Sequence, residues 1–460
     1  MHKETPMKPS AGHLPPGPTP RELLPRITKI QKDALGFLLE LSGKYGDLSY
    51  FAAGSQPVYI LSHPDGVRHI LQDQNRRYTK NTIQYNSLST ITGRGLLTSD
   101  GPFWLRQRRL IQPAFSRQRL LALDQIVVPA TRDMLGRWRE AAGQGRSVDV
   151  DGEMMRLTLE VVGKALFSID LRRDAGRLTG AVLTALDHIV YRARNVIVPP
   201  GWVPTPRNVR FRKALQFLDQ AVYTMISERR CSGLLGDDLL GMLLQARDEQ
   251  TGQPMEDSQV RDEIMTMLIA GHETVASALT WTWYLLAQNP FEQQRLCVEV
   301  SRVLGGREPC AGDLPALQYT GQIFSEALRL YPPAWVISRR AAEEDELLGY
   351  PVPVGSLIII SPYVVHRRED FWELAVEFRP ARFDPQQDAQ RHRFAYIPFG
   401  GGPRLCVGSN FAAVEAQLIL AMVAQKCRLE LLPGTRVQVD ALVTLRPQHG
   451  MPMLPIFIDQ

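Results

Sequence analysis

A glycine-rich loop around a single cysteine, Phe399–Gly408 (FGGGPRLCVG), constrains this chain more than any other feature. The apolar stretch after it predicts a helix over 409–426, so Cys406 lies just before a helix N-terminus. A cysteine ligates a metal as the thiolate, which the backbone donors and positive field of a helix N-terminus favour. Gly402 allows a turn with positive φ, and Gly408 lets the backbone approach a flat cofactor. The loop therefore predicts a thiolate ligand to haem iron.

Two further side chains of the loop fit this prediction. Phe399 would shield the cysteine sulfur, and Arg404 can reach a carboxylate on the rim of the cofactor. The alternative interpretation is a structural cysteine buried in a glycine-rich loop. Five specified residues at this spacing recur by chance roughly once in three million windows at average residue usage. The spacing therefore favours the iron ligand.

The pattern Phe-x-x-Gly-x-Arg-x-Cys-x-Gly resembles the signature of the cytochrome P450 family, the haem-thiolate monooxygenases. The resemblance implies the cytochrome P450 fold, which is mainly α with a small β region. It implies heme b as cofactor, with iron axially ligated by the Cys406 thiolate. It also implies an oxidoreductase of the soluble, bacterial type that inserts one oxygen atom from O2 into an apolar substrate.

A long helix predicted over 258–288 would span roughly 45 Å, enough to cross a whole domain. Polar residues interrupt its apolar centre at Leu268–Ser277 (LIAGHETVAS), and such groups are costly to bury without partners. One interpretation is a kinked helix whose threonine bonds back to the i−4 carbonyl. A lone histidine such as His272 is more often a satisfied neighbour than a ligand.

The centre of this helix is similar to the family's pattern of small residue, glycine, acid and threonine, at Ala270, Gly271, Glu273 and Thr274. The resemblance implies that Ala270 and Gly271 leave space for dioxygen. Thr274 would hold a water, and Glu273 would connect that water to bulk protons. These two residues are the predicted catalytic pair.

A third motif, EALR, carries Glu326 and Arg329 three residues apart on a predicted helix. On a surface such a pair would be an ordinary ion pair of little energetic value. The family places this pair in the core, joined by an arginine from a later loop, and FRPARF supplies Arg382. The resemblance implies a structural role behind the cysteine loop.

A fourth motif places Trp104 and Arg108 four residues apart on one helical face. Both could donate to a haem propionate, and the alternative is an exposed cation–π pair. The family's Trp-x-x-x-Arg helix favours the propionate. Arg339 is a similar candidate, its neighbour Arg340 is an alternative, and Lys80 is a weaker option.

Apolar residues near these motifs form the predicted substrate pocket, by analogy with family positions. Each could equally be plain core. LIAGHET and GLLTSDG look like the branch that hydroxylates long apolar molecules, so a lipid, fatty acid or terpenoid-like substrate is expected. The predicted pocket residues are Leu96, Leu97, Met267, Ala270, Ala334, Trp335, Val336 and Val443.

The organisation expected from the sequence is a proline-rich N-terminal arm over 1–25 and a single domain over 26–460. No linker, repeat or low-complexity tract divides the second part. Strands are expected only at 47–51, 57–61 and 357–360 before the C-terminus. Further helices are predicted over 117–142, 154–168, 180–192, 210–229 and 237–248.

Composition excludes several other classes of protein. A net charge of +5 with dispersed arginines is short of the clustered excess typical of nucleic-acid binding. Five cysteines without CxxC spacing form no disulfide or zinc pattern, which fits a reducing cytoplasm. The N-terminus has no apolar run of transmembrane or signal-peptide length. A soluble, cytoplasmic protein without a transmembrane anchor is expected.

No segment resembles a flavin or nicotinamide site, so the electrons are expected from a separate ferredoxin or flavodoxin-type donor. Four arginines, Arg106, Arg109, Arg391 and Arg393, flank elements expected on the cysteine side, where an acidic carrier could dock. Solvated surface charge is the alternative. Two other functions stay open: a haem-thiolate peroxygenase or isomerase that needs no electron partner, and a non-catalytic haem sensor.

Overall fold

Helices dominate the computed structural model, which describes residues 14–195, 198–247 and 252–458. The longest, α13 (Asp257–Gln288), has 32 residues and spans about 48 Å. It packs along α9 (Val150–Phe167), and a Cβ at Gly271 would lie 3.0 Å from Val162 Cγ2. Glycine at this position therefore permits the close approach of the two helices.

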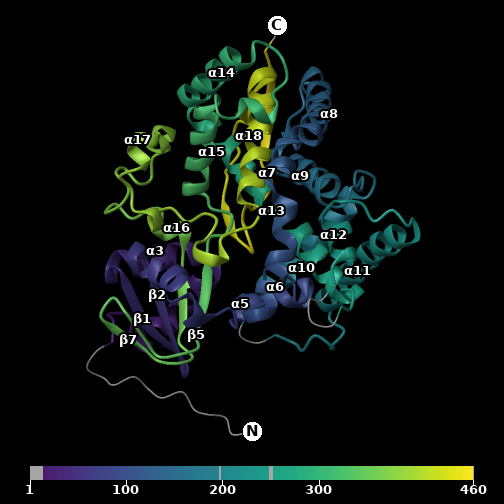
Figure 1. Cartoon of the computed structure of the whole chain (residues 1–460). Coiled ribbons are helices and arrows are strands. Elements are labelled where there is room, and N and C mark those ends of the chain that lie inside the picture. Colours follow the sequence, from purple (N-terminus) through teal and green to yellow (C-terminus); the bar gives the residue numbers. More distant parts are fainter. Residues whose placement is uncertain (1–13, 196–197, 248–251, 459–460) are drawn as a thin grey trace.

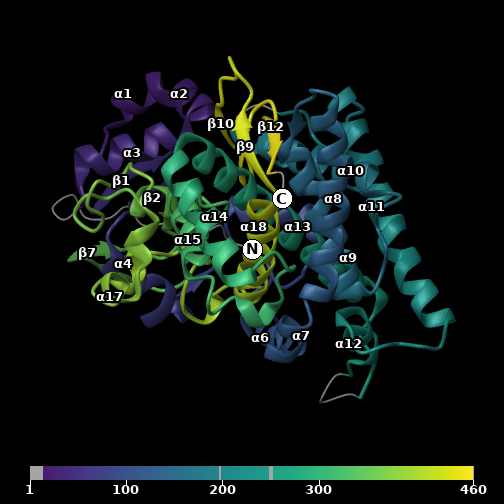
Figure 2. The ribbon, with the colours of Figure 1, turned by 90° about the horizontal axis from the view of Figure 1, so that it is seen from above.

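The helical part surrounds α13, and the sheet with α3 lies to one side of it (Figures 1 and 2). The core of the helical part includes the fully buried Trp138, Trp281 and Trp283. The longer helices are α3 (Ala34–Tyr45), α5 (Ile83–Thr92), α6 (Gly101–Ile111), α8 (Asp124–Gly143), α10 (Ala175–Arg194), α11 (Pro206–Cys231), α14 (Pro290–Leu304), α15 (Gln318–Leu330) and α18 (Ser409–Lys426). The shorter ones are α1 (Pro20–Leu23), α2 (Ile27–Lys32), α4 (Pro64–Arg68), α7 (Arg117–Leu121), α12 (Leu239–Gln245), α16 (Pro362–Val365) and α17 (Pro385–Asp388).

The strands form one five-stranded sheet and three small ones. The large sheet has the order β1 (Leu48–Ala53), β2 (Gln56–Leu61), β8 (Leu357–Ile360), β5 (Ile337–Ala341) and β3 (Tyr78–Thr79). The small sheets are β4 (Val148–Asp149) with β12 (Pro452–Phe457) and β9 (Cys427–Leu431), β6 (Asp345–Leu347) with β7 (Tyr350–Val352), and β10 (Val439–Ala441) with β11 (Leu445–Pro447). The mainly α class with a small β region is confirmed.

The expectation of only three strands before the C-terminus was wrong. β5 was missed because its sequence, ISRRA, carries two adjacent arginines that obscure the apolar alternation. Pairing with β8 on one side and β3 on the other makes it a strand in spite of that composition. The strand matters because it directs Arg339 inward.

Two predicted helices are reproduced closely, and one is divided. The helix expected over 258–288 begins one residue earlier, and the helix over 409–426 has the predicted bounds. The helix expected over 117–142 is instead α7 and α8, separated at Ala122 and Leu123. Residue 248, the predicted end of the helix over 237–248, lies outside the described residues, and α12 ends at Gln245.

The proline-rich arm predicted over 1–25 is described only from residue 14 onward, so residues 1–13 lie outside the described part. The segment that follows runs beside β1, where the Tyr50 amide donates to the Pro16 carbonyl at 3.0 Å. A Cβ at Gly17 would overlap the Tyr50 carbonyl oxygen. Among the described residues, no helix has the length and apolar character needed to span a lipid bilayer.

Candidate functional site

The cysteine loop is a tight turn closed by a backbone hydrogen bond from Cys406 N–H to the Phe399 carbonyl, at 3.0 Å. Gly402 has φ +62°, and a Cβ there would lie 1.9 Å from the Leu71 carbonyl oxygen. Only glycine fits this position, as predicted. Helix α18 begins three residues after the cysteine, at Ser409.

Cys406 is accessible at its surface and at the same time closely surrounded by protein. The residue is exposed by surface area, yet desolvation raises its pKa, so protein surrounds it without covering it completely. The Gly408 N–H and the charges of Arg108 and Lys80 act in the opposite direction and lower the pKa. The predicted positive surroundings of the thiolate are therefore present.

Four cationic side chains gather near Cys406: Lys80, Arg108, Arg339 and Arg404. Burial and then the charges of Arg339 and Arg404 hold the pKa of Lys80 well below its ordinary value. Among the described residues only Arg404 of the four makes an ion pair, with Asp100. Lys80 and Arg339 are buried without an ion-pair partner in that part of the chain, which is costly, so this donor set fits a cofactor that carries two carboxylates.

The structure distinguishes Arg339 from its neighbour. Arg339 is buried, and its guanidinium donates to the Tyr85 hydroxyl at 3.2 Å. Arg340 points to the other face of β5, where its Nε donates to the Asn81 carbonyl at 2.7 Å. Arg339 is therefore the one that joins the cation cluster.

Trp104 takes part in a cation–π contact different from the one considered from sequence. The Arg404 guanidinium lies 3.7 Å from the centre of its ring. Arg108, four residues along α6, instead donates to the Leu405 carbonyl at 2.8 Å, next to the cysteine. These contacts of Trp104, Arg108 and Arg404 hold α6 against the cysteine loop.

Three residues of α13 are partly exposed among buried neighbours: Ala270, Gly271 and Thr274. Thr274 Oγ1 donates to the Ala270 carbonyl at 2.6 Å. The back-bonded threonine considered from sequence is present, on the face that carries the predicted oxygen-side residues. A Cβ added at Gly271 would be directed toward Val162 on α9. This glycine therefore also permits close packing of the two helices.

Glu273 is buried and accepts a hydrogen bond from Thr444 Oγ1 at 2.8 Å. Burial raises the pKa of Glu273 to about 7, while the Thr444 hydroxyl and the Arg446 charge partly oppose that rise. Arg446 is itself paired with the buried Asp151. The sequence interpretation did not place Thr444, Arg446 or Asp151 near Glu273. Thr444 directly follows Val443, which was assigned to the pocket.

His272 is fully buried, and neither ring nitrogen has a hydrogen-bond partner among the described residues. Burial lowers its pKa to about 3, so the ring is neutral. Within the described part of the chain, no group of three or more histidine, cysteine or acidic side chains could hold a metal ion. His272 therefore lies in no such cluster.

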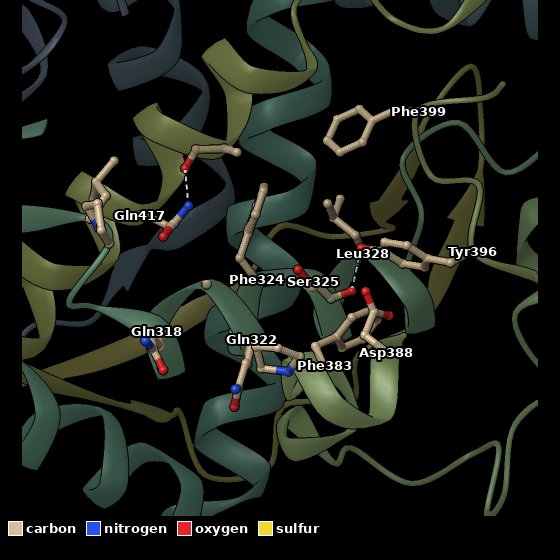
Figure 3. Close-up of a pocket in the computed structure, with 15 residues that line it drawn as sticks. Gln318, Gln322, Phe324, Ser325, Leu328, Phe383, Asp388, Tyr396, Phe399 and Gln417 are labelled. Atoms are coloured by element: carbon tan, nitrogen blue, oxygen red, sulfur yellow. Dashed lines mark hydrogen bonds between the residues drawn. The ribbon is translucent and has the colours of Figure 1, made fainter. Parts of the chain in front are cut away.

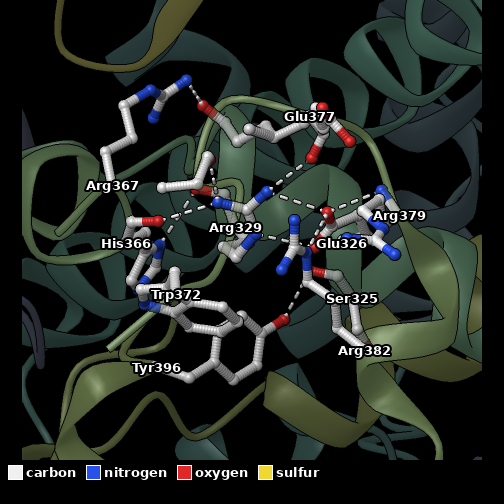
Figure 4. Close-up of polar contacts among 12 residues, drawn as sticks. Ser325, Glu326, Arg329, His366, Arg367, Trp372, Glu377, Arg379, Arg382 and Tyr396 are labelled. Atoms are coloured by element: carbon white, nitrogen blue, oxygen red, sulfur yellow. Dashed lines mark hydrogen bonds and ion pairs between the residues drawn. The ribbon is translucent and has the colours of Figure 1, made fainter. Parts of the chain in front are cut away.

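The Glu326–Arg329 pair is completely buried, with Arg329 Nε donating to Glu326 Oε2 at 2.7 Å (Figure 4). Arg382 Nε donates to Glu326 Oε1 at 3.1 Å, so the predicted third member is present. The remaining Arg329 donors bond to the carbonyls of His366, Ala375 and Glu377. Nearly every polar atom of this network therefore has a partner.

A cavity of about 470 Å³ lies between α5, α10, β8 and the turn that joins β10 to β11. Its lining is mainly apolar and includes three of the predicted pocket residues, Trp335, Val336 and Val443. The other five are not among its lining residues, so their role stays a prediction: Leu96, Leu97, Met267, Ala270 and Ala334.

A second cavity, of about 450 Å³, lies on the cysteine side between α15, α17 and α18 (Figure 3). Phe399 borders it, together with three glutamine side chains, Gln318, Gln322 and Gln417. Nearby Arg391 is not free to meet a partner protein, because its guanidinium donates to the Arg382 carbonyl at 2.7 Å and lies over the Trp372 ring.

Comparison with known proteins gives consistent matches. A model of the cytochrome P450 family matches residues 15–450. Cyclooctatin synthase from Streptomyces melanosporofaciens is 38% identical, over 92% of this chain and 90% of its own length. Pentalenene oxygenase from Streptomyces avermitilis is 34% identical, over 91% of each chain. Cyclooctat-9-en-7-ol 5-monooxygenase from Streptomyces melanosporofaciens is also 34% identical, over 95% of each chain.

Proposed function

The chain belongs to the cytochrome P450 family, and we propose that this monooxygenase hydroxylates a terpenoid with electrons from a separate ferredoxin- or flavodoxin-type carrier. Its cofactor is haem, with the Cys406 thiolate as axial ligand of the iron. When bound, the haem supplies the activation of O2 that insertion of oxygen into an unreactive C–H bond requires. The protein residues must then hold the cofactor, supply protons and position the substrate.

The cation cluster is proposed to hold the cofactor's propionates. Arg108, Arg339 and Arg404 offer guanidinium donors that suit carboxylates, and Lys80 adds a fourth charge. Trp104 orients Arg404 by stacking on it and can donate its indole N–H. Phe399, at the start of the loop, is proposed to shield the sulfur.

Proton supply is assigned to Glu273 and Thr274. A buried carboxyl whose pKa is raised to about 7 is able both to give and to take a proton near neutral pH. The Thr274 hydroxyl lies on the interior face of α13, where it can hold a water after turning from the Ala270 carbonyl. A peroxygenase or isomerase that dispenses with proton delivery does not need this pair.

The observation that carries the substrate class is the apolar cavity beside Val336 and Val443. Its volume suits a ligand of drug size, and its few polar lining groups suit a molecule that is mostly hydrocarbon. Two relatives are named for oxidation of pentalenene and cyclooctat-9-en-7-ol, which supports a terpenoid over a fatty acid.

The electron carrier is proposed to dock on the cysteine side near α6. Arg109 on α6 and Arg393 are both exposed and can meet acidic groups of a carrier. Arg391 is excluded from this role by its bonds inside the fold.

The decisive experiment is a spectral screen of the haem-loaded protein. Carbon monoxide added to the reduced protein should give the far-red-shifted Soret band of thiolate ligation, and a Cys406→His variant should lose it. Terpenes such as pentalenene should displace water from ferric iron, which changes the spectrum, whereas long fatty acids should do so weakly. Preference for fatty acids contradicts the terpenoid assignment, and faster turnover with peroxide than with any carrier favours a peroxygenase.

A further inference from the structure

The turn between β10 and β11 lies between the apolar cavity and α13. Leu442 and Val443 border the cavity on one side of the turn. On the other side, the next residue, Thr444, donates its hydroxyl to Glu273 Oε1 at 2.8 Å. One three-residue turn therefore contacts both the proposed substrate space and the proposed proton donor.

The same turn is fastened to α13 at two further points. The Leu445 carbonyl accepts hydrogen bonds from Ser277 Oγ and from Trp281 Nε1, the latter at 2.9 Å. The two donors and the acceptor Glu273 are spaced four residues apart, at 273, 277 and 281. They therefore lie along one face of α13. The turn is also held at its other end, where the Leu442 carbonyl accepts from Trp335 Nε1 at 2.9 Å, so Val443 and Thr444 lie between two fastened ends.

Glu273 has no other hydrogen-bond partner among the described residues. The charged groups that face it are Arg446 on β11 and Asp151 on α9, which pair with each other, while the neighbouring His272 is neutral. Adjacent residues of a helix point about 100° apart, so a Glu273 side chain held by Thr444 is directed away from Thr274. Turning the Glu273 carboxyl toward a water at Thr274 would break this hydrogen bond.

We propose that Thr444 positions Glu273 and makes proton delivery depend on whether the adjoining cavity is filled. A substrate in contact with Val443 displaces the turn and lengthens the Thr444–Glu273 hydrogen bond. The Glu273 carboxyl then passes its proton to a water at Thr274 and remains as a carboxylate next to Arg446 until it takes up another proton. When the cavity is unfilled, the Thr444 hydrogen bond keeps the Glu273 carboxyl directed away from Thr274. This inference rests on the proposed function and adds the coupling between its two parts.

Infrared difference spectra of the haem-loaded protein test the inference directly, with Glu273→Gln as the reference that assigns the Glu273 carboxyl band. Thr444→Val removes the donor, so we expect the protonated C=O band at higher frequency and its pH titration shifted above about 7, because the Thr444 bond lowers the pKa. Thr444→Ser should behave as the wild type. Thr282→Val is the matched control, since this buried hydroxyl on α13 bonds, within the described residues, only to the Ala278 carbonyl.

Coupling to the cavity is tested without any ligand by Val443→Phe, which adds a ring on the cavity side of the turn. We expect the carboxyl band to move in the same direction as in Thr444→Val. Pentalenene added to the wild type should also move it, and should have no effect in Thr444→Val. An unmoved band in Val443→Phe, or a shift equal in Thr444→Val and Thr282→Val, overturns the inference. Failure of pentalenene to perturb the haem spectrum contradicts the terpenoid substrate alone, because the two variants still report on the turn.

Discussion

Two buried carboxyl groups, Glu326 on α15 and Glu273 on α13, differ in how many hydrogen-bond partners the fold gives them. The carboxylate of Glu326 accepts from Arg329, from Arg382 and from the Arg379 amide, and Arg329 fills its remaining donors with carbonyls. Glu273, equally buried, accepts from one threonine hydroxyl. Beside it the two ring nitrogens of His272 have no hydrogen-bond partner among the described residues.

This difference distinguishes a structural network, around Glu326, from a candidate functional site, around Glu273. A network with nearly all of its partners in place holds one geometry and has no polar capacity left for a substrate or a proton. The carboxyl of Glu273 keeps that capacity, because it has one hydrogen-bond partner among the described residues, and burial raises its pKa to about 7. Such shifts gather at functional sites.

The largest effect is expected from disrupting the network of Glu326, Arg329 and Arg382. Arg329→Ala leaves Glu326 buried without its main partner, and the loss of one member of a buried pair costs roughly 3–5 kcal/mol. We expect little folded, haem-containing protein, measured by haem content and denaturant unfolding. Arg302→Ala, an exposed arginine on α14, is the control. Normal haem content in Arg329→Ala would show that the network is dispensable.

A smaller effect is expected from Glu263 on α13, which accepts from the Leu96 amide at 2.9 Å. Its folded pKa is raised above the unfolded value of 4.5, so stability is highest below pH 4.5 and is lost as pH rises toward about 8. Between pH 6 and pH 9 this loss amounts to about 2–3 kcal/mol. Glu263→Gln should reduce the fall in Tm over that range, and Glu228→Gln, an exposed control, should not. Parallel curves for the wild type and Glu263→Gln would refute this.

The cation cluster lies between the two regions and should affect cofactor retention rather than folding. Arg339→Met removes a charged donor worth about 1.5–3 kcal/mol, so haem should transfer to a competing apoprotein roughly tenfold faster or more. Arg340→Met serves as the control, because Arg340 bonds outside the cluster. Equal transfer rates in the two variants would remove Arg339 from the propionate site.

The smallest effect on stability is expected at Thr274. Its hydroxyl bonds only to its own helix, so Thr274→Ala should lower the free energy of unfolding by no more than about 1 kcal/mol. Its effect should appear in coupling: peroxide released per electron pair should rise several-fold, with Thr274→Ser close to the wild type. Unchanged coupling in Thr274→Ala would show that the proton path does not include this residue.

Local spacing was sufficient to predict much of the scaffold. The turn at Gly402, the bounds of α18 and the span of α13 follow from glycine freedom and apolar periodicity, which neighbours in the chain determine. The buried Glu326–Arg329–Arg382 set was predicted from the family resemblance. The strand β5 was missed because its pairing partners come from elsewhere in the chain.

By itself, the sequence predicted the cysteine ligand, the acid and alcohol of α13 and the cation candidates, because each lies in a short motif that resembles one of the family's. Only the tertiary structure decided between Arg339 and Arg340, through the alternation of β5, and stacked Arg404 on Trp104. It also joined Glu273 to Thr444, which lies 171 residues away. Contacts of this kind depend on packing between distant segments, and no local pattern records which side chains will meet.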